Sequence, residues 1–146
     1  MTLIASRHPA ARAFTLIELV VVIVVLAILS GVAIPKYLDY SAKAKESAVR
    51  GTLGAARAAI ANWYANQIVT SGAGAYPTLT QIQTNRTVMQ DMMPANPFSS
   101  TNSNAIVAAT WAATPPTSGT AGWNYDAAAG KFWANSNTSG IAENAW

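Results

Sequence analysis

An uninterrupted apolar run at residues 13–34 constrains the fold of this chain more than any other feature. It contains a single charged side chain, Glu18, near its start. A helix from Phe14 to Ile34 would be about 31 Å long at ~1.5 Å per residue. That length is enough to cross the ~30 Å hydrocarbon core of a bilayer. An ionised side chain at the bilayer centre costs roughly 2.5–3.5 kcal/mol, so Glu18 is expected to have a functional partner.

The composition argues against most enzymatic and nucleic-acid functions. The chain has no cysteine, and its one histidine, His8, lies before the apolar run. Two of the nine basic residues, Arg7 and Arg12, belong to the same short leader, which leaves seven basic against six acidic side chains. That balance does not produce the basic surface of a nucleic-acid binder. We therefore predict no catalytic residues, no metal site, no cofactor and no specific nucleic-acid partner.

Three interpretations of residues 1–34 compete. The first is a secretory signal, with small residues around Gly31 and Ala33 before a cut. The second is a plain membrane anchor, whose basic leader would stay in the cytoplasm. The third is a cut on the cytoplasmic side, between Ala13 and Phe14, that keeps the apolar part in the mature protein.

Glu18 favours the third interpretation, because neither secretion nor simple anchoring needs a carboxylate there. A cut before Phe14 would create an α-amino group four residues before Glu18. That amine has a reference pKa of about 7.7–8.0 and is largely protonated at neutral pH. A carboxylate in the first helical turn also faces the positive end of the helix dipole. The Glu18 charge could be compensated within its own chain, and better by the amine of a neighbouring chain.

The segment A-FTLIE at residues 13–18, followed by the apolar run and by Pro35, resembles the processing motif of type IV pilins and of type II secretion pseudopilins. The resemblance covers about residues 7–65. It implies that a prepilin peptidase cuts between Ala13 and Phe14 and methylates the new amine of Phe14. The family usually has glycine before the cut, so Ala13 is expected to slow processing. Glu18 would then be the charge that guides assembly.

The function implied is that of a structural, non-enzymatic subunit of a type IV pilus. Copies of the chain would form a helical homopolymer, with an ATPase-driven assembly machinery as a further partner. The subunit would reside in the inner membrane before assembly and in the extracellular filament afterwards. The alternatives are a periplasmic pseudopilin of a type II secretion system and a minor or competence pilin. A different class, an exported or membrane-anchored binding domain, remains open.

The helical pattern continues beyond the membrane-length segment, and the sequence predicts one helix of about 55 residues. Apolar residues recur at steps of three and four, which marks one buried face of an amphipathic helix. This face comprises Val49, Leu53, Ala56, Ile60, Trp63 or Tyr64, and Ile68. Pro35 and Gly31 weaken the helix near the membrane boundary. They predict a kink there, or unwinding of residues 30–36 when the subunit enters a filament.

Residues 71–146 are rich in small and polar residues and are expected to form a small sheet. The clearest element is a hairpin over residues 123–134, with Asp126 opposite Lys131 and Tyr125 opposite Phe132. Its aromatic face would pack on the long helix, and Trp133 on the other face would be exposed or would lie at a subunit contact. A short helix within residues 78–93 and a strand within 105–111 are also expected.

The predicted fold class is α+β and pilin-like, with one long N-terminal helix packed against a small antiparallel sheet. Four segments follow: a leader (1–13), an apolar membrane and assembly half of the helix (14–35), an amphipathic half (36–70) and a C-terminal β-rich domain (71–146). Many type IV pilins close their last domain with a disulfide, which this chain cannot form. Aromatic packing and neighbouring subunits are expected to hold its loops instead.

Overall fold

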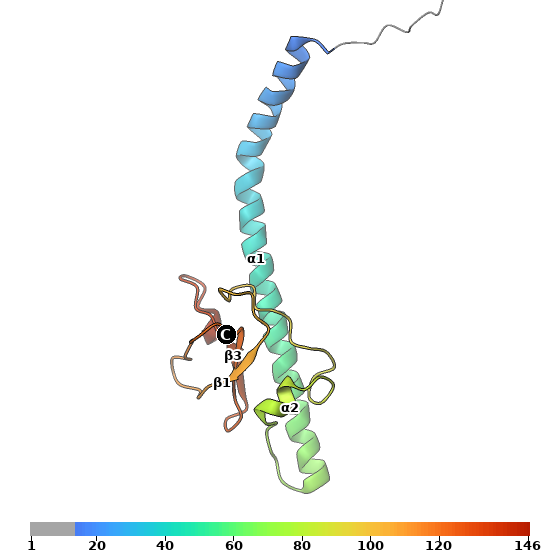
Figure 1. The fold of residues 1–146 in the computed structure, drawn as a ribbon, viewed down its shortest axis with the longest axis vertical. Helices are drawn as coiled ribbons and strands as arrows, with labels where there is room; N and C mark the ends of the chain where they lie inside the picture. The colour runs from blue at the N-terminus through green and yellow to red at the C-terminus, as the bar shows by residue number, and fades with distance from the viewer. Residues whose placement is uncertain (1–13) are drawn as a thin grey trace, which may run out of the picture. The chain divides into compact units, whose positions relative to one another are not determined.

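A computed structural model describes residues 14–146, so the leader and Ala13 lie outside the described part of the chain. The chain divides into two compact units, Met1–Tyr40 and Ser41–Trp146, which are treated separately below. One long helix takes part in both units (Figure 1). In chain order the elements are α1 (Leu16–Ser71), α2 (Leu79–Gln83), β1 (Ile106–Ala108), β2 (Trp123–Asp126), β3 (Lys131–Ala134) and the 3₁₀ helix η1 (Glu143–Ala145).

In the first unit, the apolar part of α1 has no protein packed against it. Every residue from 14 to 40 is exposed. The helix contains an 18-residue window with a mean hydropathy of 3.0, and its length and composition are sufficient to cross a membrane. Pro35 lies inside α1, which remains helical through this position. Unwinding of residues 30–36 in a filament therefore stays a prediction about the assembled state.

In the second unit, α1 supplies one wall of the hydrophobic core. The predicted helix of about 55 residues is confirmed, because α1 has 56. Four residues of its predicted apolar face are buried, namely Val49, Leu53, Ala56 and Ile60. They pack in one cluster with aromatic side chains of the sheet. The pattern of apolar residues therefore located the core face of this helix from Val49 to Ile60. Ile68, expected on the same face, is 47% exposed, because the packed part of the helix ends before it.

The sheet has the strand order β1-β2-β3. Its hairpin has the predicted register, with Asp126 opposite Lys131 and Tyr125 opposite Phe132. β1 is shorter than the predicted strand and runs parallel to β2, so the sheet is mixed and not purely antiparallel. A parallel pair needs a crossover of about a dozen residues or more, and the connection between β1 and β2 is long enough for it.

On each free edge of the sheet, one backbone carbonyl accepts a hydrogen bond from a side chain. On the β1 edge, the Gln83 amide donates a hydrogen bond of 2.8 Å to the carbonyl of Ile106. On the β3 edge, the Arg57 Nε donates one of 3.1 Å to the carbonyl of Phe132. These contacts occupy backbone groups that an edge strand would otherwise present to another chain.

Trp133 is buried within its own domain, which corrects both expectations for this residue. It is 0% exposed and packs edge-to-face against Trp111, with ring centroids 5.2 Å apart. Its indole N–H donates to the carbonyl of Pro116 at 2.9 Å. The segment between β1 and β2 thus covers the second face of the sheet. The length of that connection alone did not reveal this small second core.

The helix expected within residues 78–93 is confined to α2. Thr78 starts it with a capping box that involves Gln81, an arrangement that satisfies two backbone N–H groups at a helix N-terminus. The chain leaves the helix at Thr84, and Arg86 has a φ of 63°, which is incompatible with a continuing right-handed helix. Met92, which lies in the part of residues 78–93 that is not helical, is 67% exposed.

Cationic side chains of α1 hold the C-terminal segment in place. The Arg57 guanidinium donates to the carbonyl of Trp146 as well as to that of Phe132. The Arg50 guanidinium lies over the Trp146 ring, 4.3 Å from its centroid. Such cation–π contacts contribute about 0.5–1 kcal/mol at exposed sites. They complement the aromatic packing that was expected in place of a disulfide.

Glu143 is a completely buried carboxylate in the second unit. It accepts hydrogen bonds from the Thr138 N–H at 2.9 and 3.0 Å and from the Thr138 hydroxyl at 2.7 Å. Burial alone would raise the pKa of Glu143, but the hydrogen bonds from Thr138 and Ser136 hold that pKa below its usual value. The folded state therefore favours the charged form.

The stability of the domain should consequently depend on pH through Glu143. Because its pKa is lower in the folded than in the unfolded chain, its contribution is present above the unfolded pKa and is lost as the pH falls through the folded one. We expect Glu143→Gln to be about 2 kcal/mol less stable at pH 7 and to lose less stability than the wild type on acidification. Unfolding of the full chain in detergent at several pH values measures this. Asp91→Asn is the control, and an equal acid sensitivity of the wild type and Glu143→Gln would contradict the expectation.

Candidate functional site

The N-terminus of α1 is built by Thr15 and Glu18. Phe14 and Thr15 precede the helix, which begins at Leu16. The Thr15 N–H and the Thr15 hydroxyl each donate to one Glu18 carboxylate oxygen at 2.9 Å. The Glu18 N–H in turn donates to the Thr15 hydroxyl oxygen at 3.3 Å. This reciprocal arrangement is a capping box, with Thr15 as the N-cap.

The capping box gives the Glu18 carboxylate partners within its own chain. A negative charge at this position also interacts favourably with the helix dipole. The sequence contains the signal for this contact, a threonine followed three residues later by glutamate, although the prediction for Glu18 did not include it. The pairing of Glu18 with a Phe14 amine stays a prediction, because Phe14 is still linked to Ala13 in this chain.

The surroundings of this site are apolar and open. Phe14 is 82% exposed and Leu16 is 80% exposed. Farther along the helix, a Cβ added to Gly31 would meet no other side chain or distant backbone atom within 4 Å. Gly31 is therefore not required for close packing within the single chain. The site is a lone carboxylate at the start of a long apolar helix surface that the chain does not cover.

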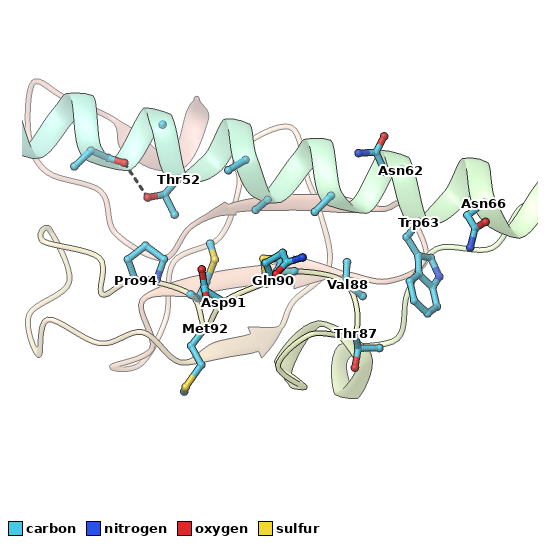
Figure 2. A pocket seen from close by; sticks show the side chains of 17 residues that line it. Thr52, Asn62, Trp63, Asn66, Thr87, Val88, Gln90, Asp91, Met92 and Pro94 are labelled. Atoms are coloured by element: carbon cyan, nitrogen blue, oxygen red, sulfur yellow. Dashed lines mark hydrogen bonds between the residues drawn. The ribbon is translucent and has the colours of Figure 1, made fainter.

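A second feature is a groove of about 810 Å³ in the unit Ser41–Trp146. One wall is the side of α1 that presents small residues, including Ala48, Gly51, Ala55 and Ala59, and Trp63 extends this wall toward the facing loop (Figure 2). The opposite wall is the segment 87–94, which is rich in methionine and contains one carboxylate, Asp91.

Neither feature has the residues of a catalytic or metal centre. Within residues 14–146, no three His, Cys, Asp or Glu side chains lie close enough together to hold a metal ion. The charged groups of the groove are limited to Asp91. What the two features offer is surface for packing, with one carboxylate in each.

Comparison with known proteins gives one family model and several similar pilin proteins. A family model described as the prokaryotic N-terminal methylation motif matches residues 9–34. The major component PilA5 of the type IV narrow pilus of Thermus thermophilus is 39% identical over 75 residues, which are 51% of this chain and 60% of the relative. The type IV major alpha-pilin of Moraxella bovis is 43% identical over 51 residues, 35% of this chain and 32% of the relative.

A third relative, the type IV major pilin protein PilA of Myxococcus xanthus, is 36% identical over 50 residues, 34% of this chain and 23% of the relative. The chain thus spans between about a quarter and 60% of the length of these curated relatives. No solved structure matches the chain significantly. Residues 9–34 thus match the prokaryotic N-terminal methylation motif, and part of the chain is similar to the pilin proteins of several type IV pili.

Proposed function

We propose that this chain is a structural subunit of a type IV pilus. A prepilin peptidase removes residues 1–13, and methylation modifies the amine of Phe14. Residues 14–35 then hold the subunit in the inner membrane and later join the filament core. Residues 36–70 attach the helix to its domain, and residues 71–146 complete that domain.

The observation that supports this proposal is the contrast between the two parts of α1. The part in Ser41–Trp146 is buried along one face, whereas residues 14–40 are exposed all round. An apolar helix of this length is stable only in lipid or against other helices. The methylation motif and the pilin relatives favour a second state in which other copies replace the lipid.

The energetics of that exchange explain why a charge and a motor are needed. Lipid is as apolar as a bundle of such helices, so apolar burial gives little net drive for leaving the membrane. The filament is instead favoured by packing between helices and by the pairing of Glu18 with the Phe14 amine of a neighbour. An ATP-driven assembly machinery supplies the work of extraction, and the finished filament is extracellular.

N-terminal sequencing of the mature protein tests the processing step. We expect the mature chain to begin at methylated Phe14, because a cut there keeps Glu18 and the apolar helix. Cells that lack prepilin peptidase are the control and should retain the leader. A mature chain that begins near Ile34 would instead identify an exported domain and would exclude the filament proposal.

Electron microscopy of sheared cells, with the protein identified in the fibres, tests the assembly step. Surface fibres that contain this chain are expected for a pilin. Protein that is processed at Phe14 but confined to the periplasm would favour the pseudopilin of a type II secretion system.

A further inference from the structure

The unit Ser41–Trp146 contains one carboxylate that has no partner in the described chain. The Glu46 carboxylate forms an ion pair of 2.8 Å with the guanidinium of Arg50, one turn further along α1. Asp126 accepts hydrogen bonds from backbone N–H groups at 2.8–3.1 Å, and Glu143 is buried and hydrogen-bonded. Asp91 alone among the four makes no hydrogen bond or ion pair within residues 14–146.

Asp91 is exposed and lies in the wall of the groove described above, next to two methionines. The facing wall presents mostly small side chains of α1 together with Trp63, and Met92 and Met93 directly follow Asp91 in the chain. Methionine side chains adapt to irregular partners. An occupant that combines small apolar groups with one cation would match both the walls and the charge, because a lysine can lay its stem on apolar surface while its ammonium group meets a carboxylate.

The turn of the β2–β3 hairpin combines small apolar residues with a lysine in this way. Its turn consists of three exposed alanines and Gly130, and Lys131 follows directly. The Lys131 ammonium lies 5.8 Å from the centroid of the Trp111 ring and forms no ion pair within the described residues. Asp126 faces Lys131 across the hairpin, but its carboxylate is engaged by backbone N–H groups.

The groove and the hairpin turn lie on different flanks of the domain. Lys131 lines a second pocket together with Arg57 of α1. At 3.6 residues per turn, Arg57 projects about 160–180° away from Ala48 and Ala59, which line the groove. The turn therefore cannot fill the groove of its own copy. If the turn of one copy binds the groove of the next, the copies are joined head to tail. Such a heterologous interface produces an open filament where the rotation from copy to copy does not close into a ring.

We propose that the groove between α1 and residues 87–94 receives the hairpin turn (residues 127–131) of a second copy, with Lys131 of that copy beside Asp91. This inference rests on the proposed filament function and adds the contact between its globular domains. The contact is heterologous, so each copy uses both surfaces, one for the copy before it and one for the copy after it.

Disulfide crosslinking tests the proposed contact, and the natural chain contains no cysteine to interfere. The variant with Met92→Cys and Ala128→Cys places one thiol in the groove wall next to Asp91 and one in the turn. Mild oxidation of sheared filaments should give a ladder of covalent trimers and longer products. The matched control, Met92→Cys with Ser139→Cys, should stay monomeric. Filaments that form normally but give no ladder would overturn this contact and leave the filament function standing. A wild type that forms no filaments would remove both proposals.

Charge reversal provides a second measurement that does not depend on introduced thiols. Asp91→Lys and Lys131→Glu should each lower the yield of sheared filaments about tenfold, because like charges then meet at the interface. Combining the two should restore the yield to within about twofold of the wild type. Lys45→Glu, an exposed reversal elsewhere on α1, should leave it unchanged. Thermal unfolding in detergent checks that each variant is folded. Single reversals without effect, or a combination that fails to rescue, would refute the pairing.

Discussion

Glu18→Ala should leave the protein processed and membrane-bound but should stop or strongly slow filament growth. Removal of the carboxylate makes the apolar segment more stable in lipid, because an ionised side chain within a membrane-spanning segment is costly. It also removes the proposed pairing with the Phe14 amine of a neighbouring subunit. Both effects favour the membrane over the filament. Immunoblots of sheared filaments and of membrane fractions measure the distribution.

The capping box offers a way to separate two roles of Glu18. Thr15→Val removes the hydroxyl that bonds to Glu18 but leaves the carboxylate available to another copy. If Glu18 acts between subunits, Thr15→Val should assemble far better than Glu18→Ala. Equal loss in both variants would assign the effect to the helix end itself. Normal piliation in Glu18→Ala would remove the proposed role of the charge altogether.

Gly122→Ala should destabilise the C-terminal domain by about 3 kcal/mol, near the upper end for overpacking. A Cβ at this position would lie 1.9 Å from the carbonyl oxygen of Ser103 and 3.2 Å from the Cβ of Asn96. The first contact is with backbone, so no side-chain rotation can relieve it. The Gly122 backbone also bonds to Ala105 and Asn135, which limits any shift. Thermal or denaturant unfolding of the full chain in detergent measures the loss.

Gly54→Ala is the matched control for this substitution. Gly54 lies on the exposed side of α1, and an added Cβ would meet no other side chain or distant backbone atom within 4 Å. Alanine is favoured over glycine in a helix by about 1 kcal/mol, so Gly54→Ala should be neutral or stabilising. A similar stability of Gly122→Ala and the wild type would show that the Ser103 segment yields easily.

Those parts of the fold that depend on local patterns were predictable from the sequence. The spacing of Val49, Leu53 and Ile60 identified the buried face of α1, because helical periodicity places such residues on one side. The aromatic residues of the hairpin fixed its register, since each of them has to reach the same core. The candidate site was predictable from Glu18, because a single carboxylate in a long apolar run is costly without a partner.

The remaining features depend on contacts between distant segments. Nothing local to Ile106–Ala108 indicates that it pairs in parallel with β2, because that depends on the path of residues 109–122. Trp133 is buried by Trp111, a contact that only this path creates. The helix expected within residues 78–93 ends at Gln83, because the chain turns at Arg86, whose left-handed backbone no apolar pattern indicates.

The side chains of Gln83 and Arg57 on the two sheet edges have a consequence for crowded assemblies. In a fibre, many identical small sheets lie close together for long periods, and unprotected edge strands of neighbouring copies could pair into one continuous sheet. Because one carbonyl on each edge strand is already hydrogen-bonded, such pairing between copies is disfavoured. The order of such a polymer would then be dictated by its helices and by side-chain contacts, which can be undone one subunit at a time.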